Sequence, residues 1–94
     1  FHFHAPSEHT VGGRHFPMEM HLVHRDADGN LAVVAVLIAE GAPHAALGAL
    51  EEHFPPEPGR AQHVEGVTVD VTELLPASLA SYRYPGSLTT PPCS

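Results

Sequence analysis

The sequence carries little positive charge. It has no lysine, and its four arginines stand against eleven aspartates and glutamates, which gives a formal net charge of −7 with histidine counted as neutral. A surface of this sign is unsuited to phosphate backbones and to anionic lipid headgroups. We therefore expect neither nucleic acid nor a membrane as the main partner, whereas a small neutral or anionic substrate is compatible with the composition.

Long apolar runs and paired cysteines are missing as well. No apolar run approaches the ~18–20 residues that a membrane-spanning helix needs, and no signal-peptide pattern is present. Cys93 is the only cysteine, so no disulfide can form within these residues. With 94 residues the chain holds one domain at most. Because it opens directly on a strand-like motif, we expect it to be part of a longer protein.

Histidines are abundant, and two of the nine open the chain in Phe1-His2-Phe3-His4. Alternate side chains of an extended strand share a face, so His2 and His4 point to one side. His21 lies in a second alternating run and completes a three-imidazole set if the two runs pair as antiparallel neighbours. Three imidazoles suit Zn²⁺ or cobalt and leave one coordination position open, as catalytic zinc sites do. An ordinary pair of strand histidines is the alternative.

Three features favour the metal site. Glu19 lies two residues before His21 on the same face, where its carboxylate can accept the ring N–H and set the tautomer of that imidazole. Glu8 follows His4 closely, and a threonine of the hydroxyl-rich segment 88–90 can donate to this carboxylate, which leaves the hydroxyl able only to accept from a group on the metal. The third feature is an apolar wall suited to a small nonpolar substrate, formed by Val23 with Val33 and Leu88 as candidates.

Hydrophobic periodicity and turn residues predict a mainly β chain with a minor helix. Residues 1–4 and 18–24 alternate as strands, residues 5–17 form a connection rich in turn formers, and residues 26–30 form a turn around Asp28-Gly29. The apolar run 31–39 does not alternate, so we expect a strand in the middle of a sheet, covered on both faces. The other expected elements are a helix over 43–53, a strand over 67–71, a turn at 74–76 and an extended segment from residue 82.

Five motifs, in this order, resemble the alpha-class carbonic anhydrases and above all their bacterial members. They are FHFH at 1–4, SEHT at 7–10, MEMHLVH at 18–24, LAV at 31–33 and YPGSLTTPP at 84–92. The resemblance covers essentially the whole chain, although the chain corresponds to less than half of a family domain. It implies a central, mostly antiparallel twisted sheet of the carbonic anhydrase type, incomplete at both ends, with residues 1–94 as the central part of a single catalytic domain.

The resemblance also implies a role for each site residue. His2, His4 and His21 correspond to the zinc ligands, and Glu19 corresponds to the carboxylate that orients His21. Glu8 and Thr89 correspond to the gate that orients zinc-bound hydroxide. The residues implied to face carbon dioxide are Val23, Val33, Leu88, Thr89 and Thr90.

By this resemblance the protein is an enzyme, a zinc lyase that converts carbon dioxide and water reversibly to bicarbonate and a proton, and that sulfonamides and anions inhibit. Bacterial members are commonly exported, so we expect a periplasmic or secreted location. Cys93 resembles the cysteine that bonds an upstream partner outside this chain in secreted forms, and such a disulfide would pin the Thr89 loop to the body of the domain. A free buried thiol is the alternative for Cys93.

Two alternatives use the same residues. A cupin would take Glu8 as a ligand of iron or manganese, because His2-x-His4 followed by Glu8 matches its first motif, but it leaves the Glu19-x-His21 pair and the segment 88–92 unexplained. A non-catalytic carbonic-anhydrase-like module would keep the fold as a zinc-holding or binding surface, although such relatives typically lose a ligand histidine. The remaining histidines need no metal: we expect His9 to make a structural hydrogen bond and His15 to lie on the surface or in a turn.

Overall fold

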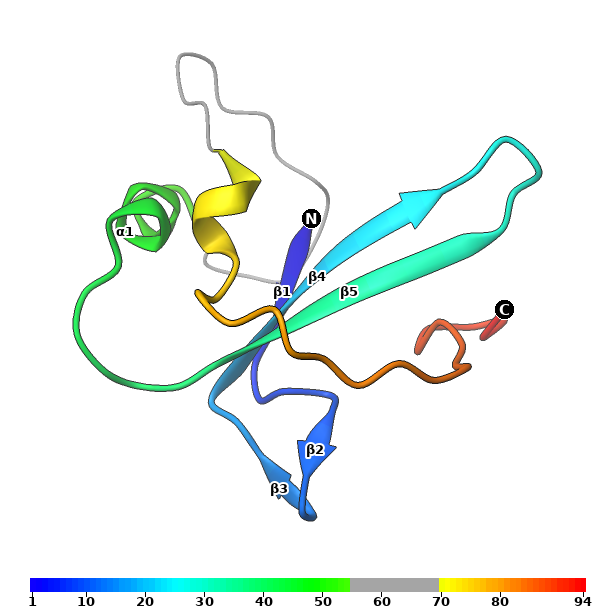
Figure 1. Ribbon diagram of the computed structural model, residues 1–94, viewed down its shortest axis with the longest axis horizontal. Helices are drawn as coiled ribbons and strands as arrows, with labels where there is room; N and C mark the ends of the chain where they lie inside the picture. Colours follow the sequence, from blue (N-terminus) through cyan, green and yellow to red (C-terminus); the bar gives the residue numbers. More distant parts are fainter. Residues whose placement is uncertain (55–69) are drawn as a thin grey trace.

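The largest unit of the fold is a three-stranded antiparallel sheet in the order β1-β4-β5 (Figure 1). The computed structural model describes residues 1–54 and 70–94. β1 is His2–His4, β4 is Met18–Arg25 and β5 is Leu31–Ile38. β4 lies between the other two strands and pairs antiparallel with both. The predicted strands at 1–4 and 18–24 are therefore confirmed, and they pair antiparallel, which is the condition that the three-imidazole set requires.

β4 and β5 form a hairpin closed by the predicted turn. The register runs from Met18 opposite Ile38 to Arg25 opposite Leu31. In the turn the Asp26 carboxylate accepts the backbone N–H groups of Asp28 and Asn30 at 2.9 and 2.8 Å, and Gly29 takes a φ of 86°. An aspartate that accepts local N–H groups and a glycine with positive φ are the usual chemistry of a tight turn.

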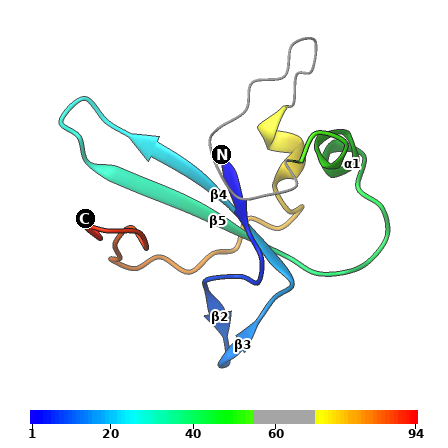
Figure 2. The ribbon, with the colours of Figure 1, turned by 180° about the vertical axis from the view of Figure 1, so that it is seen from behind.

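The predicted connection 5–17 contains a second, smaller hairpin. β2 (Thr10–Val11) and β3 (Arg14–His15) pair antiparallel, and the hairpin projects from the end of the sheet where β4 begins (Figure 2). The prediction of a connection rich in turn formers was incomplete, because the two adjacent glycines were not recognised as the loop of a hairpin. Gly12 and Gly13 have φ values of 58° and 77°, and positive φ at both central residues is what a two-residue hairpin loop requires.

β5 differs from its prediction in its place in the sheet. The run 31–39 was expected in the middle of a sheet with both faces covered, but β5 ends at Ile38 and occupies the edge next to β4. Val33 and Val34 are 43% and 44% exposed. Among the described elements only β4 pairs with this strand. The apolar composition of β5 indicates a preference for burial, but it carries no information about which segment provides the cover.

The single α-helix of the described residues is shorter than predicted. α1 spans Ala45–Glu51, two residues inside the expected range at each end. His44 is extended, with φ of −111° and ψ of 122°, and its ring accepts the N–H of Leu47, so it is the N-cap and the helix begins after it. Ala46 is buried and Glu51 is exposed, as the helical spacing of the apolar residues predicted.

The predicted strand at 67–71 is wrong where it can be compared with the structure. Residues 67–69 lie outside the described residues, as do Pro55, Pro56 and Pro58, which follow the predicted helix in the sequence. Val71 begins η1, a 3₁₀-helix over Val71–Leu74. The Asp70 carboxylate accepts the N–H of Thr72 at 3.0 Å, and this N-cap starts a helical turn instead of a strand. η1 contacts α1, and its end at Leu74 agrees with the turn expected at 74–76.

The core and the polar face lie on opposite sides of β4. Met20 is 1% exposed and forms the core with Ala46 and Leu74. Glu19 and His21 point the other way and are 0% and 7% exposed. This arrangement follows from the two-residue period of a strand. No helix in the described residues is long and apolar enough to cross a membrane.

We expect the 94-residue chain by itself to be poorly stable. Its described residues bury a small apolar core, while β5 leaves an apolar edge in water, and the net stability of a domain is a small difference between large opposing terms. Heating the isolated chain should therefore give a broad, non-cooperative transition by circular dichroism. A sharp transition together with a well-dispersed amide spectrum would show that these residues fold alone.

Candidate metal centre

Three imidazoles meet where β1 pairs with β4. The register places His2 opposite His21 and His4 opposite Glu19. The ring centroids of the three histidines are 4.8, 5.1 and 4.6 Å apart. One nitrogen from each of His2, His4 and His21 lies within 4.8 Å of the others. Strand pairing thus brings together all three histidines that the sequence singled out, in a group able to hold a metal ion.

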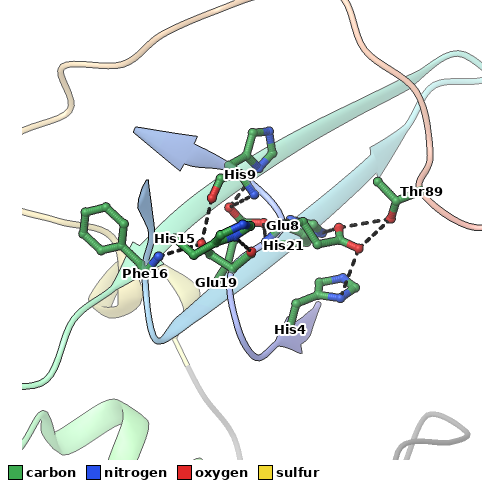
Figure 3. A network of polar contacts seen from close by, with 9 residues as sticks. His4, Glu8, His9, His15, Phe16, Glu19, His21 and Thr89 are labelled. Atoms are coloured by element: carbon green, nitrogen blue, oxygen red, sulfur yellow. Dashed lines mark hydrogen bonds and ion pairs between the residues drawn. The ribbon is translucent and has the colours of Figure 1, made fainter. Parts of the chain in front are cut away.

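The buried Glu19 carboxylate determines which nitrogen His21 offers. His21 Nε2 lies 2.6 Å from Glu19 Oε2 (Figure 3). A carboxylate can only accept here, so Nε2 carries the hydrogen and the lone pair of the neutral ring remains on Nδ1. The Nδ1 atom of His21 is therefore the one available to a metal. The contact predicted between Glu19 and His21 is present.

Glu19 binds a second imidazole and two backbone groups. His9 Nδ1 lies 2.8 Å from Oε1, and the N–H groups of Glu8 and His9 donate to the two carboxylate oxygens at 3.3 Å each. Burial by itself would raise the pKa of Glu19, but the hydrogen bonds and charges of His21 and His9 outweigh it and hold the pKa below its ordinary value. The carboxylate is therefore ionised near neutral pH.

The electrostatics of the cluster favour a neutral His2 ring. Burial, followed by the charges of His4 and His21, lowers the pKa of His2. A metal ion binds the neutral form of histidine, and protons compete with it for the ring nitrogen. The packing of the three rings therefore keeps His2 in the form that a metal needs.

Glu8 and Thr89 meet beside this cluster although they are 81 residues apart in the chain. Thr89 Oγ1 lies 2.8 and 3.0 Å from the two Glu8 carboxylate oxygens. The same carboxylate lies 3.5 Å from His4 Nδ1 and 3.9 Å from His21 Nδ1. The expected contact between Glu8 and a threonine of the segment 88–90 is present, and it connects the C-terminal segment to the three imidazoles.

The apolar residues expected beside the site lie on three segments. Val23 follows His21 on the same face of β4 and pairs with Val33 of β5; these side chains are 44% and 43% exposed. Leu88, half buried, and Thr90, exposed, flank Thr89. The structure therefore brings Val23 and Val33 together as cross-strand neighbours, in a position open to solvent.

A second group, formed by His9, Glu19 and His21, also has the composition of a metal site. His9 Nδ1 lies 2.8 Å from Glu19 Oε1, and His21 Nε2 lies 2.6 Å from Glu19 Oε2. These are the distances of charge-assisted hydrogen bonds. Hydrogen bonds already account for this group, and it contributes to the first cluster by orienting His21. The group of His2, His4 and His21 is therefore the candidate metal centre.

The sequence did not reveal every residue around the centre. His9 makes the expected structural hydrogen bond, but its partner, Glu19, was not foreseen. His15 was expected on the surface or in a turn, and it is exposed, yet its Nδ1 lies 2.6 Å from the Ser7 carbonyl oxygen. Neither contact follows from local spacing, because both partners are several residues away across a turn. Cys93 is free and exposed in this chain, so the described residues do not bury its thiol.

The comparisons with known proteins agree with this geometry. The family model described as eukaryotic-type carbonic anhydrase matches residues 1–94. A carbonic anhydrase from Klebsiella pneumoniae is 48% identical over 94 residues, which is 100% of this chain and 38% of that protein. One from Nostoc is 43% identical, over 100% of this chain and 36% of that protein. The cupin alternative is therefore wrong.

A solved structure shows the same fold. The alpha-carbonic anhydrase from Thermovibrio ammonificans, solved with the inhibitor sulfanilamide, superimposes with a TM-score of 0.88 at 48% sequence identity, and the match covers 99% of this chain and 41% of that one. This similarity confirms the predicted fold class, a mainly β chain with antiparallel sheets of the alpha-carbonic anhydrase type. The chain spans about two fifths of the relatives that it matches.

Replacing Glu19 should weaken metal binding without removing a ligand. In Glu19→Gln the charge that orients the His21 ring is lost, and changes to such partners typically lower metal affinity by about 10–100-fold. Competition with a chelator for Zn²⁺ in the full-length protein measures the effect. The matched control is Glu51→Gln on the exposed side of α1, which should bind as the wild type does. Equal affinity of Glu19→Gln and wild type would contradict the role assigned to Glu19.

Proposed function

This chain belongs to the eukaryotic-type carbonic anhydrases, and on that basis we propose that the protein catalyses the reversible hydration of carbon dioxide to bicarbonate and a proton with Zn²⁺ held by His2, His4 and His21. Residues 1–94 would be the central part of a single catalytic domain, which agrees with the share of each relative that the chain matches. The remainder of that domain would cover the exposed edge of β5.

The observation that carries this proposal is that two features lie side by side in the structure. Three imidazoles converge from β1 and β4, and a threonine that donates to a carboxylate lies beside them, brought from the other end of the chain. A zinc-holding surface without catalysis would need the imidazoles but not the Thr89–Glu8 pair. The presence of both favours the enzyme over the non-catalytic module.

The residues fit Zn²⁺ by their donor chemistry. Three neutral imidazole nitrogens make the ligand set of a catalytic site with one open position, and Glu19 leaves His21 Nδ1 free to bind. When bound, zinc supplies a Lewis acid that lowers the pKa of a water molecule, a behaviour for which carbonic anhydrases are the standard example. Glu8 is not needed as a ligand, because its carboxylate accepts from Thr89.

Thr89 would select and orient the attacking oxygen. Its hydroxyl has one hydrogen, and the Glu8 carboxylate accepts it. The Thr89 oxygen can then only accept a hydrogen bond from a group in the site. It therefore favours an oxygen nucleophile that still carries a hydrogen, and it points the lone pair of that nucleophile away from itself. Both Glu8 carboxylate oxygens lie within hydrogen-bond distance of Thr89 Oγ1, so either can accept that hydrogen.

The substrate would lie against the apolar residues beside the centre. Val23 and Val33 face each other across β4 and β5, and Leu88 comes immediately before Thr89. Carbon dioxide is small and has no net charge, so apolar side chains suit it better than the polar cluster does. The Thr89 backbone N–H and Thr90 would face the substrate oxygens.

The proposal also covers the inhibitors of the protein, its location in the cell and the bond that Cys93 forms. Sulfonamides and small anions would occupy the open position of the centre, in line with the sulfanilamide complex of the Thermovibrio ammonificans relative. The protein would work in the periplasm or as a secreted protein. Cys93, which is free and exposed in this chain, would there bond a cysteine outside residues 1–94 and restrain the segment that carries Thr89.

His21→Ala should abolish both metal binding and activity in the full-length protein. Loss of a ligand should cost at least the roughly 10–100-fold that loss of an outer partner costs in metal affinity or rate. Zinc analysis and stopped-flow hydration of carbon dioxide provide the measurements. His24→Ala is the matched control, because His24 lies on the same strand, exposed and three residues further on. Unchanged activity in His21→Ala would overturn the ligand assignment.

Thr89→Ala should separate the orientation of the attacking oxygen from metal binding. The variant should keep its zinc, because Thr89 is not a ligand, while kcat falls by about 100-fold or more, the usual effect of removing one orienting hydrogen-bond group. Thr89→Ser should recover most of the rate. Thr72→Ala is the control, since Thr72 Oγ1 donates to Asp70 at 2.6 Å at the start of η1 and has no hydrogen bond to the imidazoles among the described residues. A Thr89→Ala enzyme with wild-type kcat would contradict the role of Thr89 in orienting the attacking oxygen.

A further inference from the structure

The segment Ser7–His9 is held by hydrogen bonds at almost every polar group. The Ser7 N–H donates to the Phe16 carbonyl oxygen at 2.9 Å, and the buried Ser7 hydroxyl donates to the His9 carbonyl at 2.7 Å while accepting the Phe16 N–H at 2.8 Å. The N–H groups of Glu8 and His9 donate to Glu19. The Glu8 side chain takes no part in these bonds and reaches Thr89 instead.

The peptide group between Ser7 and Glu8 is fixed at both of its polar ends. Its N–H, which belongs to Glu8, donates to Glu19 Oε2 at 3.3 Å. Its carbonyl oxygen, which belongs to Ser7, lies 2.6 Å from His15 Nδ1. A carbonyl oxygen only accepts, so Nδ1 of His15 carries the hydrogen. Because a peptide group is planar, holding both ends prevents its rotation and thereby sets the direction in which the Glu8 side chain leaves the backbone.

His15 reaches this peptide group from the β2–β3 hairpin. It pairs with Thr10 across that hairpin, and its ring turns back toward the segment Ser7–His9 (Figure 3). Among the contacts of the described residues, His15 makes none with the three imidazoles or with Thr89. It is also exposed, so its burial contributes little to the core. Among the described residues, the hydrogen bond to the Ser7 carbonyl is the contact by which the His15 side chain can affect the centre.

We propose that His15 is a positioning residue for the Glu8–Thr89 pair. By fixing the Ser7–Glu8 peptide group from the side opposite to Glu19, it holds the Glu8 carboxylate where Thr89 Oγ1 can donate to both of its oxygens. This inference rests on the proposed function, because a positioned Glu8–Thr89 pair matters for rate only in a catalytic site. It adds to that site a residue on the outer surface of the hairpin.

Two replacements of His15 separate the hydrogen bond from the bulk of the ring. His15→Phe keeps an aromatic ring and removes the donor, whereas His15→Asn places an amide N–H close to the position of Nδ1. In the full-length zinc enzyme, His15→Phe should lower kcat for carbon dioxide hydration by about tenfold, because small displacements of orienting groups cost up to about 100-fold. The zinc content and KM should stay at wild-type values. His15→Asn should recover most of kcat, and the control His24→Phe should match the wild type.

A double-mutant cycle with Thr89 distinguishes positioning from a general structural role. If His15 acts through Glu8 and Thr89, then adding His15→Phe to Thr89→Ala should lower kcat no further, since coupled residues are non-additive. A merely structural role would lower kcat by the same factor in both backgrounds. Additive effects, or a wild-type kcat for His15→Phe, would overturn the inference.

Amide hydrogen exchange gives a readout that does not depend on activity. In the metal-free full-length protein, the Glu8 and His9 amides should exchange faster in His15→Phe than in the wild type, while the amides of β5 stay unchanged. If His15→Phe does not fold, His15→Leu takes its place in both experiments. Unchanged exchange at Glu8 and His9 would show that His15 does not hold the peptide group.

The two proposals fail in different ways. A wild-type protein that binds no zinc or hydrates no carbon dioxide would overturn the proposed function, and with it the catalytic role of His15. A wild-type enzyme that is active, with additive effects in the cycle or unaltered exchange, would overturn the role of His15 alone.

Discussion

The site depends on one buried charge, the Glu19 carboxylate. It is fully buried, and a buried carboxylate is stable only when its oxygens are paired and hydrogen-bonded. Here two imidazoles and two backbone N–H groups meet that requirement. The hydrogen bonds that satisfy the buried carboxylate therefore also hold these four groups in position, and two of the groups belong to residues around the three imidazoles. Oε2 alone binds both the imidazole of His21 and the N–H of Glu8.

β4 combines this polar face with the core of the fold. Met20 lies between Glu19 and His21 in sequence and points the other way, into the packing around Ala46 and Leu74. The packing behind the strand and the hydrogen bonds in front of it therefore restrain the same backbone. A metal site gains precision when its ligands project from such regular elements, because the backbone that carries them has little freedom.

The rest of the centre is assembled over long distances in the chain. Thr89 comes from the C-terminal segment and meets Glu8 near the N-terminus, while His15 reaches the Ser7 carbonyl from a separate hairpin. These contacts connect the C-terminal segment and the β2–β3 hairpin to the single short stretch Ser7–His9. Family membership explains why such an arrangement exists, and the individual hydrogen bonds explain how it holds. Within residues 1–54 and 70–94, no strand pairs with the outer edge of β5.

Local sequence determined what depends on short-range geometry. Strand alternation placed His2 with His4 and Glu19 with His21, and the Asp28-Gly29 turn predicted the hairpin between β4 and β5, because side-chain direction and turn conformation repeat over a few residues. The five motifs added the family, and with it the roles expected for the site residues.

Tertiary structure decided what local patterns leave open. The register that puts His2 opposite His21, the edge position of β5, the hairpin formed by Gly12 and Gly13 and the contact of His15 with Ser7 all depend on which segments meet. Pairing between distant segments is set by the packing of the whole fold and leaves no local period in the sequence. For this reason the sequence alone singled out the three histidines of the candidate centre and the carboxylate that orients His21, and only the folded chain showed the contacts of His9 with Glu19 and of His15 with Ser7.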